Sequence, residues 1–138
     1  MASILKVDTI TGVSTAGSIA ITGEGNSTTT NLQQGLSKAW CNLNGTGTAA
    51  IRDSFNTASI TDNGTGDYST TNTSAMNNVN YVCNATAGQN SGDQACASNN
   101  QASQNRTTTV VRTQVQRSTS DSALDVSVCE VNKMGDLA

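Results

Sequence analysis

The stretch NGTGTAAIRDSFNTASITDNGTGDYS, residues 44–69, decides the fold class of this chain. It holds two related strings, NGTGT at 44–48 and NGTGD at 63–67. Each Asn-Gly pair is a hairpin signal, because these two residues tolerate positive φ at successive positions. Three short strand-like runs accompany the turns, at 49–55, 58–62 and 67–73. The stretch therefore predicts short antiparallel strands joined by tight turns.

The chain continues in the same style beyond this stretch. Residues 81–85 alternate as another candidate strand, and two longer alternating runs follow at 108–115 and 124–131. The polar string RSTSDS at 117–122 separates the longer runs, so we predict that they form a closing hairpin. The apolar face of the last run shifts by one residue at Cys129, which indicates a bulge or a strand buried on both sides.

On the N-terminal side of this stretch, the spacing of the apolar residues changes from that of a strand to that of a helix. Residues 31–40, NLQQGLSKAW, place Leu32, Leu36 and Trp40 four apart, which predicts a short helix with one apolar stripe. Ten residues are too few for a helix that is stable alone, so another surface must cover the stripe. Two coverings stay open: the helix lies on its own domain, or three copies form a seam along a symmetry axis.

The first thirty residues predict a strand, a turn, a second strand and a linker. Residues 3–10 alternate in polarity, 18–22 form a second short run, and GEGNSTTT at 23–30 has no periodicity. We therefore divide the chain into an N-terminal β-arm at 1–22, a linker at 23–30, a short trimerising helix at 31–40 and a compact antiparallel β-sandwich-like head at 41–138. The expected fold class is all-β with one short helix.

The composition predicts assembly with other copies. Hydrophobic residues make up 35% of the chain and aromatic residues 3%, so a single copy has few large side chains to bury. The net charge is only −3, whereas disordered chains usually combine low hydrophobicity with high net charge. A homotrimer whose neighbouring copies complete the core fits this composition. The alternative is a loosely folded polar chain.

The sequence argues against nucleic-acid binding, membrane insertion and a secretory signal peptide. The seven Lys and Arg residues are spread along the chain, so we expect no nucleic-acid binding. No apolar run is long enough to insert into a membrane. MASILKVDTI lacks the charged and apolar regions of a secretory signal peptide. We therefore expect synthesis in a cytoplasm and release by another route, such as lysis inside an assembled particle.

Residues for catalysis are scarce. The chain has no histidine, so its serines and cysteines lack the usual base that activates a nucleophile. Most aspartates lie beside turn signals, where this residue makes local hydrogen bonds. The cysteine spacings match no zinc pattern, and the Gly-x-Gly strings lack the features of a phosphate loop. We expect no enzyme activity, no cofactor and no metal site.

Four cysteines allow three disulfide pairings, between which the sequence does not choose. We expect free thiols that act as small buried hydrophobic groups. The alternative is a disulfide between Cys83 and Cys96, because that bond would staple the two ends of a long polar segment.

That polar segment is 86–106, which has no periodicity and almost no apolar residues. Two interpretations stay open, a flexible insertion and an exposed tip that contacts a partner. The candidate contact residues of the tip are Gln89, Asn90, Asp93, Gln94, Asn99, Asn100 and Gln101.

Several strings together resemble a known family. They are LQQGLSKAW, the stretch at 44–69, the opening MASILKVDTITG and the ending LDVSVCEVNKMGDLA. The set resembles the C-terminal module of tail-fibre and appendage virion proteins of marine tailed bacteriophages of the cyanophage type. The chain departs from the family in the strand after Tyr68. In the family, large apolar residues alternate with polar ones in this strand, whereas here it reads STTNTS. It is also short for a tail fibre.

The resemblance implies an all-β, homotrimeric virion protein with a receptor-facing head. It favours the trimer seam for Leu32, Leu36 and Trp40. Attachment to other virion proteins would fall to the N-terminal strand, through Ile4, Leu5, Val7 and Ile10. The implied function is a tail fibre or appendage that adheres to a host receptor or glycan. A capsid decoration or head-fibre protein is the alternative, and a glycan-degrading appendage enzyme is a remote one.

Overall fold

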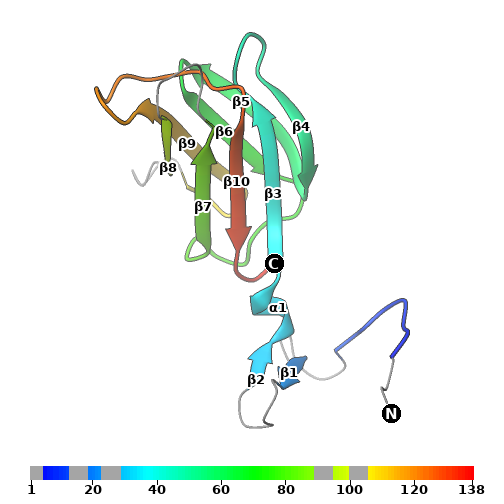
Figure 1. Ribbon diagram of the computed structural model, residues 1–138. Coiled ribbons are helices and arrows are strands. Elements are labelled where there is room, and N and C mark those ends of the chain that lie inside the picture. The colour runs from blue at the N-terminus through cyan, green and yellow to red at the C-terminus, as the bar shows by residue number, and fades with distance from the viewer. Residues whose placement is uncertain (1–4, 13–18, 23–28, 89–94, 100–105) are drawn as a thin grey trace. The chain divides into compact units, whose positions relative to one another are not determined.

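The computed structural model describes residues 5–12, 19–22, 29–88, 95–99 and 106–138. The chain divides into two compact units, Met1–Leu36 and Ser37–Ala138, and each is considered by itself. The described residues form short antiparallel strands and a single short helix (Figure 1). The predicted fold class, all-β with one short helix, is confirmed. The larger unit begins at Ser37, a few residues before the predicted boundary.

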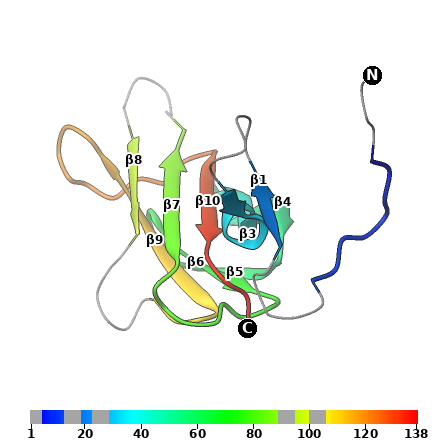
Figure 2. The ribbon, with the colours of Figure 1, turned by 90° about the horizontal axis from the view of Figure 1, so that it is seen from below.

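The larger unit is a sandwich of two four-stranded antiparallel sheets. The first sheet contains, in spatial order, β4 (Ala50–Phe55), β3 (Ser37–Asn44), β10 (Cys129–Met134) and β7 (Val82–Ala87). The second contains β5 (Thr57–Gly64), β6 (Asp67–Asn72), β9 (Val110–Arg117) and β8 (Ala95–Asn99). Figure 2 shows the two layers from the end of the sandwich.

Both hairpins predicted from the Asn-Gly strings are present. Strands β3 and β4 pair on either side of the first string, and β5 and β6 pair around the second. The second turn lies slightly later than predicted, because Gly64 sits at a bulge and Gly66 takes the left-handed conformation, with φ +64. A Cβ atom on Gly66 would meet the Val115 carbonyl oxygen at 2.4 Å, so glycine is required there.

A single residue carries the chain from one sheet to the other between these hairpins. Asn56 follows β4, precedes β5 and has φ 52, a conformation that asparagine tolerates better than most residues. Its side-chain amide donates to the carbonyl oxygens of Lys38 at 2.9 Å and Ser74 at 3.2 Å. The Ser74 amide donates back to Asn56 Oδ1 at 2.7 Å. These bonds tie the corner to two other segments.

The predicted closing hairpin is wrong, because β9 and β10 lie in different sheets. The turn at 117–122 does form, and its return segment pairs briefly with β9 through the Leu124 amide and the Val115 carbonyl, at 3.1 Å. The chain then crosses to the first sheet, where β10 lies between β3 and β7. Burial of Val126 in the core favours this crossing over a continued hairpin. The one-residue shift of the apolar face at Cys129 marks the end of the crossing.

The core is narrow and partly polar. Its main cluster consists of Cys41, Leu43, Tyr68, Val115, Val126, Cys129 and Val131. A smaller cluster at Met76, Tyr81 and Val111 packs beside it. The unusual sequence of β6 places Thr70 and Asn72 among the buried residues, alongside Tyr68. Polar side chains thus occupy interior positions that apolar residues would normally fill.

The prediction of a helix over 31–40 is wrong for most of these residues. Helix α1 spans only Leu32–Gly35, Leu36 is extended, and Ser37–Asn44 is strand β3. Strand β3 pairs on both sides, with β4 and β10, and these hydrogen bonds outweigh a weak helical preference that Gly35 already interrupts. Leu32, Leu36 and Trp40 therefore do not share a helical stripe.

The N-terminal arm also differs from the prediction. Strand β1 (Ala20–Thr22) pairs with β2 (Thr29–Asn31), part of which was predicted as linker. Residues 5–12 are not in a strand, so the alternation at 3–10 has no partner strand in the described residues. Leu5, Val7 and Ile10 are exposed, and Ile4 lies outside the described residues.

The polar segment at 86–106 is not wholly irregular. Strand β8 lies inside it and pairs with β9, and its Ala95 and Ala97 pack against the core. Small alanine side chains at alternate positions are enough for an edge strand over a thin core, which is why apolar content alone did not reveal it.

Candidate functional site

The outer face of the first sheet presents two rows of side chains that cross all four strands. Strand register defines the rows because directly opposite residues in neighbouring strands share a face. One row contains Phe55, Trp40, Asn132 and Asn84. The other contains Asp53, Asn42, Glu130 and Thr86. We call this surface the outer groove.

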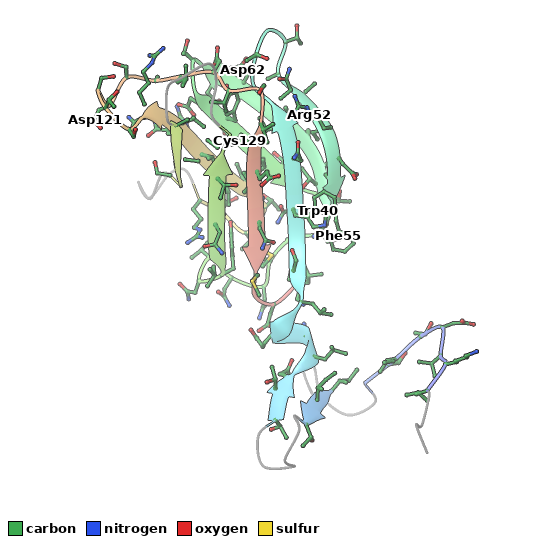
Figure 3. The ribbon with its side chains drawn as sticks, viewed as in Figure 1. Trp40, Arg52, Phe55, Asp62, Asp121 and Cys129 are labelled. Atoms are coloured by element: carbon green, nitrogen blue, oxygen red, sulfur yellow. The ribbon has the colours of Figure 1, made fainter. Side chains whose placement is uncertain are left out.

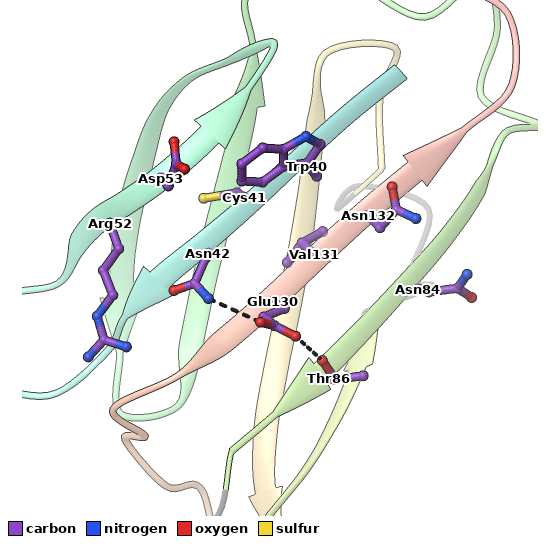
Figure 4. Close-up of a pocket in the computed structure, with 10 residues that line it drawn as sticks. All are labelled: Trp40, Cys41, Asn42, Arg52, Asp53, Asn84, Thr86, Glu130, Val131 and Asn132. Carbon is purple, nitrogen blue, oxygen red and sulfur yellow. Dashed lines mark hydrogen bonds between the residues drawn. The ribbon is translucent and has the colours of Figure 1, made fainter. Parts of the chain in front are cut away.

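The outer groove is an open depression of about 660 Å³. Seven of the eight residues in the two rows line it, all except Phe55, and Arg52 lies at its edge (Figure 4). Arg52 reaches this side because the register shifts between Asn42 and Leu43, so β3 and β4 carry a bulge here. The result is a broad, shallow site with amide, carboxylate, hydroxyl and guanidinium groups around one indole ring.

Trp40 and Phe55 form an exposed aromatic pair. They are directly opposite in β3 and β4, and their side chains lie next to each other in Figure 3. Trp40 is 37% exposed and Phe55 is 53% exposed, whereas Tyr68 and Tyr81 are buried. The chain has only these four aromatic residues and a thin core, yet two of them face solvent side by side. An exposed apolar patch with a polar surround is typical of an interaction site.

Glu130 is held in a fixed orientation at the centre of the outer groove. Asn42 Nδ2 donates to its Oε1 at 3.0 Å, and Thr86 Oγ1 donates to its Oε2 at 3.2 Å. Both bonds are drawn in Figure 4. Since each carboxylate oxygen is positioned by a neighbouring strand, a ligand meets a carboxylate that needs little reorganisation.

The second carboxylate of the groove, Asp53, lies two strands away from Glu130 in the same row. Two strand spacings correspond to about 10 Å between Cα atoms. The two carboxylates are therefore too far apart to share a proton or an ion. Among the residues that the structure describes, no group of three or more His, Cys, Asp or Glu side chains is placed to hold a metal ion.

The predicted site residues are only partly brought together. Trp40 is in the outer groove, but on a strand, while Leu32 and Leu36 belong to the other unit. Most of the predicted contact tip lies outside the described residues, namely Gln89, Asn90, Asp93, Gln94, Asn100 and Gln101. Asn99 ends β8, and the structure does not describe its side chain.

The alternative interpretation, a disulfide between Cys83 and Cys96, is not borne out, because Cys83 forms no disulfide bond. Cys83 lies opposite Lys133 in the first sheet, whereas Cys96 belongs to β8 in the second sheet. The buried free thiols expected as the default are present at Cys41 and Cys129. Burial raises the pKa of Cys41 to about 11 and that of Cys129 to about 12.

The polar row of the outer groove was not predicted from the sequence; it consists of Asn42, Asp53, Thr86 and Glu130. A signal for part of it was present: Ala39, Cys41 and Leu43 alternate with Trp40 and Asn42, as in a strand with one buried face. The four-residue spacing of Leu32, Leu36 and Trp40 obscured that alternation.

No protein-family model, curated protein or solved structure matches this chain. Within the described residues, no helix has the length and apolar content that crossing a membrane requires.

Proposed function

We propose that this protein is a structural component of a bacteriophage virion, a homotrimeric tail fibre or appendage whose head adheres to glycans of the host surface. The observation that carries the adhesive role is the exposed aromatic pair beside the polar rows of the outer groove. The virion role is supported by the resemblance of the strings at 32–40 and 44–69 to phage appendage modules.

The chemistry of the outer groove suits a sugar ring. The C–H face of a pyranose packs on an indole ring, because the ring offers a large apolar surface with a negative face. The hydroxyl groups of the sugar are both donors and acceptors, and they match the amides and the fixed Glu130 carboxylate. Two carboxylates and one guanidinium in the groove, with a net charge of −3, disfavour polyanionic chains. We therefore propose neutral glycans as the ligand class.

The test of adhesion is a comparison of Trp40→Ala with wild type on immobilised neutral polysaccharides. We expect Trp40→Ala to weaken binding by about tenfold or more, equivalent to about 1.4 kcal/mol. Val82→Ala is the matched control, because Val82 is exposed on the same sheet but outside the groove. Equal binding by wild type and Trp40→Ala would remove the groove from the proposal. Release of shorter sugars during the assay would favour the enzyme alternative.

The test of the virion role is independent of sugar binding. Purified phage particles are analysed by mass spectrometry and labelled with an antibody against the head. We expect the protein in the particles and the label on the tail. Label spread over the capsid would favour a decoration protein, and absence from the particles would overturn the virion role.

A further inference from the structure

An amine and an amide are in contact inside the sandwich. Lys133 in β10 of the first sheet is 1% exposed, and Asn72, the last residue of β6 in the second sheet, is 4% exposed. Lys133 Nζ donates to Asn72 Oδ1 at 2.6 Å and to the Thr70 carbonyl oxygen at 3.4 Å. The contact joins the two sheets across 61 residues of sequence.

The surroundings of this contact favour the neutral, reactive amine of Lys133 over its charged form. Burial lowers the pKa of Lys133 to about 8, so the neutral, nucleophilic amine is well populated in mildly alkaline solution. The other groups that shift this pKa are the thiols of Cys83 and Cys41 and the guanidinium of Arg106. Asn72 Nδ2 is buried and has no hydrogen-bond partner among the described residues, so nothing there holds the amide nitrogen in place.

We propose that Lys133 and Asn72 condense to form an intramolecular isopeptide bond that ties the two sheets together. The neutral Nζ attacks Cγ of Asn72, the Nζ–Cγ bond forms and the Cγ–Nδ2 bond breaks. The proton lost by Nζ passes to Nδ2, which leaves as ammonia. The reaction consumes no oxidant, metal or cofactor, and the amide oxygen stays in place.

The position of the bond gives it a mechanical role. It would enclose residues 72–133 in a covalent ring that includes strands of both sheets, so pulling the sheets apart would require breaking a covalent bond. None of the described groups that shift the pKa of Lys133 is a carboxylate able to shuttle protons between the two nitrogens. We therefore expect slow condensation, over days rather than minutes, at a rate set by the neutral amine.

The experiment is mass spectrometry of the wild-type protein, freshly purified and after storage at about pH 6 and about pH 9, on either side of the lowered pKa. We expect the intact mass to fall by one ammonia, and faster at the higher pH. Trypsin should then release residues 53–106 joined to 118–138 as one branched peptide, uncleaved after Lys133. The branched peptide is the deciding readout, because cyclisation at Asn44-Gly45 or Asn63-Gly64 also releases ammonia but leaves linear peptides.

Asn72→Ala and Lys133→Met are the control variants, and neither should give a branched peptide. Met conserves most of the lysine volume while removing the amine. The wild type decides the question even if these variants fail to fold. If stored wild type yields residues 53–106 and 118–133 as separate peptides, Lys133 and Asn72 form only a hydrogen bond and the proposal is overturned.

Discussion

Two thiols face the core from neighbouring strands of the first sheet. Cys41 in β3 is 2% exposed and Cys129 in β10 is 0% exposed. Desolvation by burial is the main reason that the pKa of each thiol is raised. A thiolate is therefore costly at either position, and both cysteines act as small apolar groups that help fill a core with few large side chains.

The raised pKa values predict a loss of stability in alkaline solution. The pKa of each thiol is higher in the folded protein than in the unfolded chain, so the folded state favours the protonated thiol. The stability that this contributes is complete below the unfolded-state pKa of about 8.5 and is lost as the pH rises towards the folded-state pKa. We expect the free energy of unfolding to fall by about 1.4 kcal/mol per pH unit for each thiol above that point. Urea unfolding at several pH values, compared between wild type and a Cys41→Ala, Cys129→Ala variant, measures this.

Lys133 acts in the opposite direction between about pH 8 and 10.4, because its folded-state pKa is lowered. The quantity to follow is therefore the difference in free energy of unfolding between the variant and the wild type, since Lys133 contributes to both proteins. If this difference does not change between neutral pH and about pH 10.5, the prediction is contradicted.

At the scale of elements, the corner at Asn56 determines how the two central hairpins stack. Strand β4 ends at Phe55 and β5 begins at Thr57, so this one residue redirects the chain between the sheets. Its side chain bonds to the backbone of β3 at Lys38 and to Ser74 in the segment after β6. The corner thus links both sheets at one end of the sandwich.

Substitution at Asn56 should separate the conformational effect from the hydrogen bonds. Asn56→Ala loses the side-chain bonds and places alanine at positive φ, so we expect the free energy of unfolding to fall by about 3 kcal/mol. Asn56→Gly removes the steric cost and should be less destabilising than alanine by about 1 kcal/mol. Thermal and urea unfolding measure both values.

Asp121 offers a matched control, because it also has positive φ, at 53, but is exposed in the turn at 117–122. Asp121→Gly should leave stability within about 0.5 kcal/mol of wild type. If Asn56→Gly is equally neutral, the side-chain bonds at the corner contribute little.

At the scale of the whole molecule, the smaller unit leaves apolar side chains uncovered. Leu5, Val7, Ile10, Ile21 and Leu36 are each more than half exposed. Its secondary structure is a two-stranded ribbon and one turn of helix in the described residues, and an isolated ribbon is marginally stable in water. Association with other copies or with virion proteins would cover these side chains.

We predict a homotrimer in solution, with a mass near 42 kDa (three times 14.1 kDa) by light scattering in the presence of reductant. Ile21→Ser with Leu36→Ser should lower the mass towards that of a monomer, because both changes remove apolar surface from the smaller unit. Val82→Ser, on the exposed face of the larger unit, is the control and should stay trimeric. A folded wild-type monomer would contradict the prediction and weaken the argument for an appendage.

The sequence by itself determined the local features of this protein, and the tertiary structure decided which strands meet. Asn-Gly pairs and alternation sufficed for the hairpins around residues 44–69, because a tight turn and the strands beside it are encoded within a few residues. The partner of β10 could not be predicted in this way, since strands in both sheets offered it similar alternating faces. Packing of Val126 and pairing with β3 and β7 settled that choice.

In the outer groove, too, the sequence indicated one residue and the tertiary structure decided the rest. Trp40 was a candidate from sequence, but its placement beside Phe55 and the Glu130 row depended on β3 being a strand rather than a helix. A ten-residue segment has too little intrinsic preference to decide between these states, and hydrogen bonds to two neighbouring strands decide it. The contact of Lys133 with Asn72 likewise joins residues far apart in sequence, and only the stacking of the two sheets brings them together.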